Sequence, residues 1–208
     1  MKTHKNLSKV RSRWLNKPIA SYLYDDWLVD KGSLTKRLQQ RYANFSVQAV
    51  AVKYAKPIVD EAALLHSQSY KAALIREVLL MGDNQAVVFA HSVLPSASLR
   101  GAWHRLGRLG SKPLGATLFA NPKVQRTPLS YKKLSANHTL YQHAMKCLAQ
   151  HSMQTTIQTS TQISTQEKPV HQKPNYLWAR RSIFRLNRAN IMVTEVFLPQ
   201  LLVNITVK

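Results

Sequence analysis

Apolar positions alternate with polar ones in several short stretches of the chain, which is typical of strands with one buried face. Such a strand is predicted over residues 46–59, with Pro57 close to its end. Residues 70–95 hold two apolar runs joined by Gly-Asp-Asn-Gln, which suits a tight turn. Residues 176–199 predict a second hairpin, which turns around residues 187–190. Because short turns join most of these strands, we predict an α+β fold with a single antiparallel β-sheet flanked by helices.

Helical patterns precede and separate these strands. Residues 21–40 predict one helix, a break at Gly32 and a second helix capped by Ser33, and this break is a candidate binding corner. Residues 100–119 mix short helical pieces with glycine and proline stops, so we expect a loop near the sheet. Residues 137–153 predict a short amphipathic helix.

One segment has a composition that does not suit a packed core. Between residues 152 and 166, twelve of the fifteen residues are Gln, Ser or Thr, which bury too little apolar surface to offset the entropy lost on ordering. We expect a mobile excursion there. The 208 residues suit a single domain, with a basic, frayed tail at about residues 1–18 and a low-complexity insertion at about residues 135–173.

The formal net charge of +21 makes nucleic acid or an anionic membrane surface a partner to consider. The basic residues are spread along the chain, however, and no recognition helix, zinc-finger spacing or RNA-binding motif accompanies them. We therefore expect no specific nucleic-acid partner. No apolar run approaches the ~20 residues needed to cross a bilayer, and the N-terminus lacks the apolar stretch of a secretory signal. We therefore predict no transmembrane segment and a cytoplasmic location.

Neither cysteine nor histidine gives a signal for a metal site. The single Cys147 excludes an internal disulfide and a multi-cysteine site, and we expect it to be an inert side chain. His138, His143 and His151 lack the i, i+4 spacing of a helical metal site, so we interpret them as surface or packing histidines.

Glu195 is the most unexpected residue of the predicted final strand. On a strand it shares one face with apolar side chains, including Val193 and Phe197. An ionised carboxylate in such a setting is costly unless a cation or several donors meet it. Glu195 therefore needs a partner or must line a cavity.

Arg76 is the other charged residue in an apolar strand pattern, because it shares a face with Leu74 and Val78 while Glu77 points the opposite way. One interpretation is structural: an Arg76–Glu195 ion pair, or an arginine that extends to the edge of the sheet. The other is a small polar pocket, in which the guanidinium binds a carboxylate and Glu195 holds or donates a proton. The sequence pattern leaves both open.

Five stretches carry a resemblance to a known family: DWLVDKGSLTKRLQQ, REVLLMGDN, VLP, LGSKPLGATLF and LWARRSIFRLNRANIMVTEVFLP. In this order they resemble bacterial chorismate lyase, the enzyme that releases pyruvate from chorismate to leave 4-hydroxybenzoate, as the first committed step of ubiquinone biosynthesis. The resemblance implies an antiparallel sheet with helices covering one side, a buried ligand cavity closed by flaps, and no cofactor or metal.

Carried over residue by residue, the resemblance places catalytic roles on Arg76 and Glu195 and substrate contacts on Leu34, Arg76, Leu114 and Glu195. Leu34 stands where the family usually has methionine. Arg76 would stabilise negative charge on the departing enolpyruvate, while Glu195 would hydrogen-bond the ring hydroxyl or protonate the leaving group. An internal hydrogen transfer that needs no protein base is also compatible with these residues.

The implied partners are chorismate and 4-hydroxybenzoate, and we expect a monomer. An alternative class stays open, because the effector domains of a group of bacterial transcription regulators resemble this fold. Such a domain would bind a small acid without reacting with it. No DNA-binding region is recognisable in these 208 residues, and Arg76 and Glu195 are both retained, so the lyase is the preferred interpretation.

Overall fold

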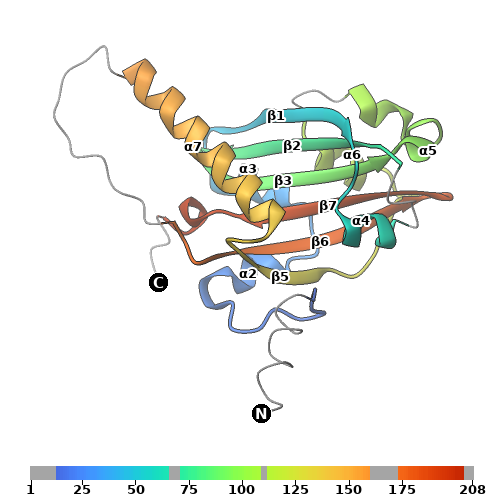
Figure 1. Ribbon diagram of the computed structural model, residues 1–208, viewed down its shortest axis with the longest axis horizontal. Coiled ribbons are helices and arrows are strands. Elements are labelled where there is room, and N and C mark those ends of the chain that lie inside the picture. Colours follow the sequence, from blue (N-terminus) through green and yellow to red (C-terminus); the bar gives the residue numbers. More distant parts are fainter. Residues whose placement is uncertain (1–12, 66–70, 109–111, 160–172, 204–208) are drawn as a thin grey trace.

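The computed structural model describes residues 13–65, 71–108, 112–159 and 173–203 (Figure 1). In these residues one antiparallel sheet has the strand order β1-β2-β3-β7-β6-β4, and β5 pairs with β6 beside β4. The strands are β1 (Phe45–Ala55), β2 (Ala73–Gly82), β3 (Gln85–Pro95), β4 (Gln125–Arg126), β5 (Ser130–Ser135), β6 (Tyr176–Leu186) and β7 (Ala189–Phe197). The predicted α+β fold with a single antiparallel sheet is confirmed.

Short helices connect the strands. They are α2 (Asp25–Val29), α3 (Leu34–Arg41), α4 (Val59–Leu64), α5 (Ser96–Leu99), α6 (Leu114–Ala120) and the longer α7 (Thr139–Thr159), with 3-10 turns η1 (Tyr22–Tyr24), η2 (His104–Arg108) and η3 (Pro199–Leu202). Within the described ranges, no helix combines the length and the hydropathy that a membrane crossing requires.

The helices cover both faces of the sheet. On one face, α2, α3 and α6 pack against side chains such as Val78 and Leu74; we call this the α3 face. On the other, α7 crosses the strands and packs against side chains such as Leu79 and Phe89; we call this the α7 face (Figure 1). The arrangement that the resemblance implied, with helices on one side only, is therefore wrong. Adjacent strand residues point to opposite faces, so each helix layer meets its own set of side chains.

Both predicted hairpins are confirmed, and their turns set the register of the sheet. β2 and β3 are joined by Asp83 and Asn84, which both have positive φ (47° and 65°), as a two-residue turn between twisted strands requires. β6 and β7 are joined by Asn187, also with positive φ, and Arg188. This tight second turn places Arg180 directly opposite Glu195.

The predicted helix break is also present. Helix α2 ends at Val29, and α3 begins after Ser33, whose side chain accepts a hydrogen bond from the backbone N–H of Lys36 at 3.4 Å. Between them, the Asp30 carboxylate accepts the backbone N–H of Gly32 at 2.7 Å. The chain therefore turns sharply just before Leu34.

Two segments are more ordered than the sequence predicts. Residues 114–120, expected in a loop, form α6, because Leu114 and Leu118 lie one turn apart and are both buried against the sheet. Helix α7 continues to Thr159, so the first part of the segment 152–166, expected to be a mobile excursion, is helical. Extending an existing helix costs less than nucleating one, which explains how a polar sequence can continue it. Residues 160–172 lie outside the described residues.

The boundaries expected for the insertion and the tail also need correction. The expected insertion at about residues 135–173 begins with core structure, because Leu140 and Ala144 of α7 are fully buried. Of the basic tail, residues 1–12 lie outside the described residues. Leu15 exchanges two backbone hydrogen bonds of 2.8 Å with Tyr131, and the Trp14 indole N–H donates to Asp60 at 3.0 Å. The expected frayed tail is therefore attached to the fold from Trp14 onward.

Candidate active site

A pocket lies on the α3 face, between the sheet and the first turns of α3 and α6. The cavity proper is small, about 40 Å³, within about 490 Å³ of space that includes open solvent. Its walls include all four residues that the resemblance singled out: Leu34, Arg76, Leu114 and Glu195. The remaining lining is mostly apolar: Thr35, Val47, Val78, Leu80, Ala90, Ser92, Pro113, Gly115, Leu118, Phe119, Phe184 and Val193. A pocket of this kind, with few polar groups in an apolar wall, suits a small organic acid.

Arg76 supplies a buried cation to this pocket. It lies on β2, is only 3% exposed, and donates through Nη2 to the backbone carbonyl of Lys112 at 2.8 Å. Burial lowers the pKa of its guanidinium, because a charge is costly away from water. A carboxylate ligand would offset this cost.

Leu34 and Leu114 form the apolar side of the pocket opposite the sheet. They are the first residues of α3 and α6, and both are buried. The two helices come so close that a Cβ on Gly115 would lie 3.0 Å from Oγ1 of Thr35. A side chain at position 115 would therefore require the Thr35 side chain to shift by a few tenths of an ångström.

Glu195 does not pair with Arg76, which corrects the ion pair that the sequence left open. Its carboxylate accepts from Nε of Arg180, on the adjacent strand β6, at 2.5 Å. Nη2 of Arg126 lies 4.0 Å from the same oxygen, Oε2. Arg76 lies two strands away on β2, with β3 between them, so Arg76 and Glu195 lie apart on the same sheet wall of the pocket.

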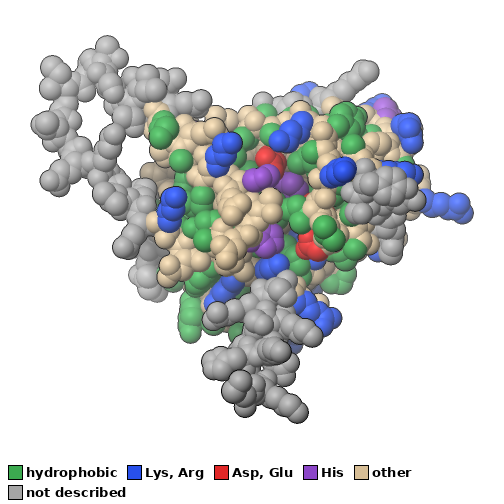
Figure 2. All heavy atoms as spheres, viewed as in Figure 1, with side chains coloured by type: hydrophobic (Ala, Val, Ile, Leu, Met, Phe, Trp, Pro, Cys, Tyr) green, Lys and Arg blue, Asp and Glu red, His purple; other side chains and the backbone are tan. Residues whose placement is uncertain are grey.

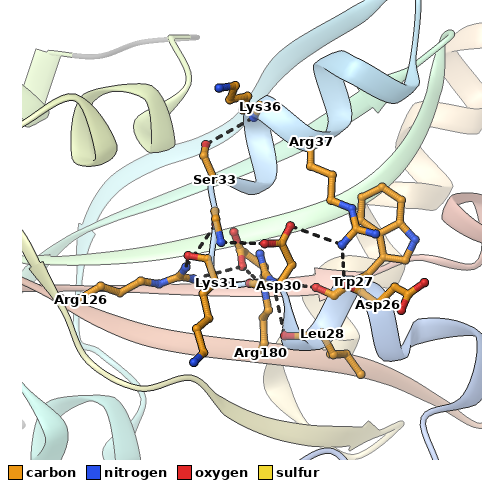
Figure 3. A network of polar contacts seen from close by, with 12 residues as sticks. Asp26, Trp27, Leu28, Asp30, Lys31, Ser33, Lys36, Arg37, Arg126 and Arg180 are labelled. Atoms are coloured by element: carbon orange, nitrogen blue, oxygen red, sulfur yellow. Dashed lines mark hydrogen bonds and ion pairs between the residues drawn. The ribbon is translucent and has the colours of Figure 1, made fainter.

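Arg180 joins Glu195 to the helix break before Leu34. Its side chain is fully buried, and Nη1 donates to the backbone carbonyls of Trp27 and Asp30, each at 2.6 Å. In Figure 3, Arg180 and Arg126 point toward the backbone of this segment from two different strands. We call residues 27–32 the corner.

Arg126 holds the last residues of the corner. It donates to the carbonyls of Lys31 and Gly32 at 3.0 and 3.3 Å (Figure 3). It also donates to the Ser182 hydroxyl at 2.8 Å. Its guanidinium also lies over the ring of Phe184, 5.2 Å from the centroid. Burial lowers the pKa of Arg126, although the charge of Glu195 opposes this shift.

Sequence reasoning did not find the two arginines beside Glu195. The position of Arg180 could have been predicted from the length of the turn between the last two strands. A two-residue turn at Asn187 and Arg188 places Arg180 opposite Glu195, whereas the four-residue turn predicted at residues 187–190 places Ser182 there. No such signal pointed to Arg126, because β4 is only two residues long and has no periodic pattern.

A second cluster of buried charges lies on the α7 face. His91 is held between two carboxylates, with Nδ1 3.0 Å from Glu77 and Nε2 3.3 Å from Glu61. His143 of α7, half exposed, lies 2.8 Å from the same Glu77 oxygen. Within the described ranges, no three such side chains gather in a way that could hold a metal ion. Because Glu77 contacts His91 and His143 on the α7 face, it points away from Arg76 and its pocket, as predicted.

The charges of this cluster stabilise one another. Burial alone would lower the pKa of His91, but the hydrogen bonds and negative charges of Glu61 and Glu77 raise it to about 9. Burial alone would raise the pKa of Glu77, but His91 and His143 lower it to about 2. The cluster is therefore an ion-pair network within the core.

The fold of this sheet and its helices also occurs in an effector domain of known structure. The effector domain of PhnF from Mycobacterium smegmatis superposes with a TM-score of 0.51, covering 81% of this chain and 90% of that one. Only 12% of the residues are identical, so this likeness concerns the fold alone. It agrees with the expected resemblance to effector domains.

Sequence comparison defines the family. Residues 11–207 match the chorismate lyase family model. A probable chorismate pyruvate-lyase of Methylobacillus flagellatus is 42% identical over 193 residues, which cover 93% of this chain and 96% of that protein. Another from Thiobacillus denitrificans is 42% identical over 176 residues, covering 85% and 82%. The chain belongs to the chorismate lyase family.

Proposed function

We propose that this protein is a chorismate pyruvate-lyase, which converts chorismate into 4-hydroxybenzoate and pyruvate and so begins ubiquinone biosynthesis. The observation that carries the proposal is that Arg76 and Glu195, two strands apart on one sheet face, both line one mostly apolar pocket. A buried cation and a carboxylate that lie apart in one pocket match a flat acid that has a carboxylate at one end and a hydroxyl at the other.

The reaction needs orientation and charge placement. The ether bond between the ring C3 and the enolpyruvyl oxygen breaks, the hydrogen at C4 is lost, and the ring becomes aromatic while the departing group becomes pyruvate. Negative charge develops on the departing enolpyruvate, and Arg76 would stabilise it through its planar guanidinium. Leu34 and Leu114 would pack against the ring and exclude water from it.

The contacts of Glu195 leave one of its two oxygens for a ligand. Arg180 and Arg126 both face Oε2, and a guanidinium has only donors, so Oε2 acts as an acceptor. Oε1 is then the atom with which Glu195 would meet a ligand. In this arrangement Glu195 accepts a hydrogen bond from the ring hydroxyl and orients the substrate, and the hydrogen from C4 passes directly to the enolpyruvyl group.

The direct test is to incubate the purified protein with chorismate and follow ultraviolet absorbance for 4-hydroxybenzoate, with an enzymatic assay for pyruvate. We expect the two products in equal amounts. Exhaustive chelation beforehand should leave the rate unchanged; a loss that zinc or magnesium restores would contradict a metal-free reaction. Tight binding of 4-hydroxybenzoate without turnover would instead identify a non-catalytic module that binds small acids.

A further inference from the structure

The least expected group near the pocket is Arg180. Its side chain has no exposed surface, and one of its nitrogens, Nη2, is buried without a hydrogen-bond partner among the described residues. Burying a guanidinium with an unsatisfied donor is costly, and apolar residues of similar volume often replace such groups without loss of stability. Packing alone therefore does not account for an arginine at this position.

The bonds that Arg180 does make connect separate parts of the pocket wall. Nε holds Oε2 of Glu195 on β7, while Nη1 holds the carbonyls of Trp27 and Asp30 in the corner. The corner leads directly into Leu34, which lines the same pocket. The guanidinium is planar and rigid, so its Nε and Nη1 bonds fix the carboxylate and the corner relative to one another.

We propose that Arg180 is a positioning residue that aims Glu195 at the ring hydroxyl, so that the pocket selects ligands bearing a hydroxyl opposite their carboxylate. This inference rests on the proposed function. With Oε2 occupied by Arg180, the plane of the carboxylate is set and Oε1 is the oxygen presented to the ligand. A lysine at position 180 keeps the charge, but its ammonium group lacks the planar arrangement of donors that binds the carboxylate and the two carbonyls at once.

Arg181 offers a matched control on the same strand. It points to the α7 face, is also buried, and pairs with the Asp60 carboxylate at 2.7 Å. Replacing either arginine with lysine removes a planar guanidinium, itself buried, from an ion pair of β6. Only Arg180, however, contacts a residue that lines the pocket.

The experiment compares the affinities of 4-hydroxybenzoate and benzoate, which differ only in the hydroxyl, for the wild type, Arg180→Lys and Arg181→Lys. A hydrogen bond to a charged group should favour 4-hydroxybenzoate by about tenfold or more in the wild type. We expect Arg180→Lys to reduce this preference to about threefold or less and Arg181→Lys to retain it. If Arg180 served stability alone, Arg180→Lys would weaken the binding of both ligands equally. An unchanged preference for 4-hydroxybenzoate over benzoate in this variant therefore overturns the proposal.

A second measurement uses the unmodified protein and does not depend on the folding of a variant. The Nε–H proton of Arg180, observed by NMR, should shift when 4-hydroxybenzoate binds and stay nearly unchanged with benzoate. Equal shifts with both ligands would contradict the inference. If the wild type turns over chorismate while either contradictory result is found, the positioning role fails and the proposed function stands. If the wild type neither turns over chorismate nor binds 4-hydroxybenzoate, the proposed function fails, and this inference with it.

Discussion

The two faces of the sheet both bury charged side chains, but they arrange them differently. On the α7 face, the charges of Glu61, His91, Glu77 and His143 pair with one another, and His91 lies between two carboxylates. Figure 2 shows this side of the molecule: histidine side chains reach the surface next to an acidic one, and Lys and Arg are scattered around them. On the α3 face, Arg76 and Glu195 do not pair with one another, and both line a pocket.

The difference shows that burial of charge alone does not identify a site. Arg76 and Glu77 are neighbours in the chain, and both are buried in β2. Glu77 has its partners in the protein, so its charge contributes to stability. Arg76 lines a cavity, where a ligand can add the opposite charge. Neighbouring residues should therefore give opposite results when they are replaced.

The largest effect is expected on the α7 face, from Glu77→Gln. This change removes the only carboxylate paired with His143 among the described residues and one of the two paired with His91. Breaking one half of a buried ion pair costs about 3–5 kcal/mol of the free energy of unfolding. The turnover of chorismate at 25 °C should remain within about twofold, provided that the protein is folded. Chemical denaturation measures the first quantity and the absorbance assay the second. A large loss of turnover in folded protein would mean that the two faces are coupled.

The same face should make stability depend on pH. The pKa of His91 is raised to about 9, so its contribution is complete below its unfolded value of 6.5 and is lost as the pH rises through 9. The pKa of Glu77 is lowered to about 2, so its contribution is complete above 4.5 and is lost as the pH falls through 2. Between pH 6.5 and 9 the free energy of unfolding should fall by up to about 1.4 kcal/mol per pH unit.

The His91→Gln variant serves as the control for this titration. It should be less stable at pH 6 and should lose most of the decline between pH 6.5 and 9. An unchanged alkaline decline in the variant would assign the dependence to other groups.

On the α3 face, Arg76→Lys should lower kcat/KM for chorismate by about 10²-fold, because an ammonium keeps the charge but not the planar fork. The midpoint of thermal unfolding should change by only a few degrees. Steady-state kinetics measure kcat/KM and a thermal melt measures the unfolding midpoint, and both values are compared with those of Glu77→Gln. Near-normal kinetics would show that Arg76 only balances charge in the pocket.

The smallest effects are expected from Glu195, if it orients the substrate. Glu195→Gln keeps the size and an acceptor oxygen, so most of kcat should remain, whereas Glu195→Ala should mainly raise KM, by about tenfold. A fall in kcat of about 10²-fold or more in the Gln variant would instead identify a proton donor. If both variants are fully active and only less stable, Glu195 is a structural partner of Arg180, and the two faces do not differ in kind.

Local geometry allowed much of this to be predicted from the sequence. Side chains alternate along a strand, so the apolar patterns around Arg76 and Glu195 placed each residue on a mostly apolar face, and Glu77 on the opposite side. The turn at Gly82 to Asn84 and the cap at Ser33 depend only on residues a few positions away in the chain. The first hairpin and the cap of α3 were therefore predicted at the right places.

The tertiary structure alone decided which groups meet. Arg180 reaches the carbonyl of Trp27 across 153 positions of the chain, and Arg126 reaches that of Lys31 across 95. Such contacts depend on strand order and register, and a change of two residues in the turn after β6 would move Arg180 away from Glu195. Helix α6 likewise forms because Leu114 and Leu118 pack against the sheet, although its sequence favours a loop. Local patterns determine which face a residue points to, whereas the packing of distant segments determines its partners.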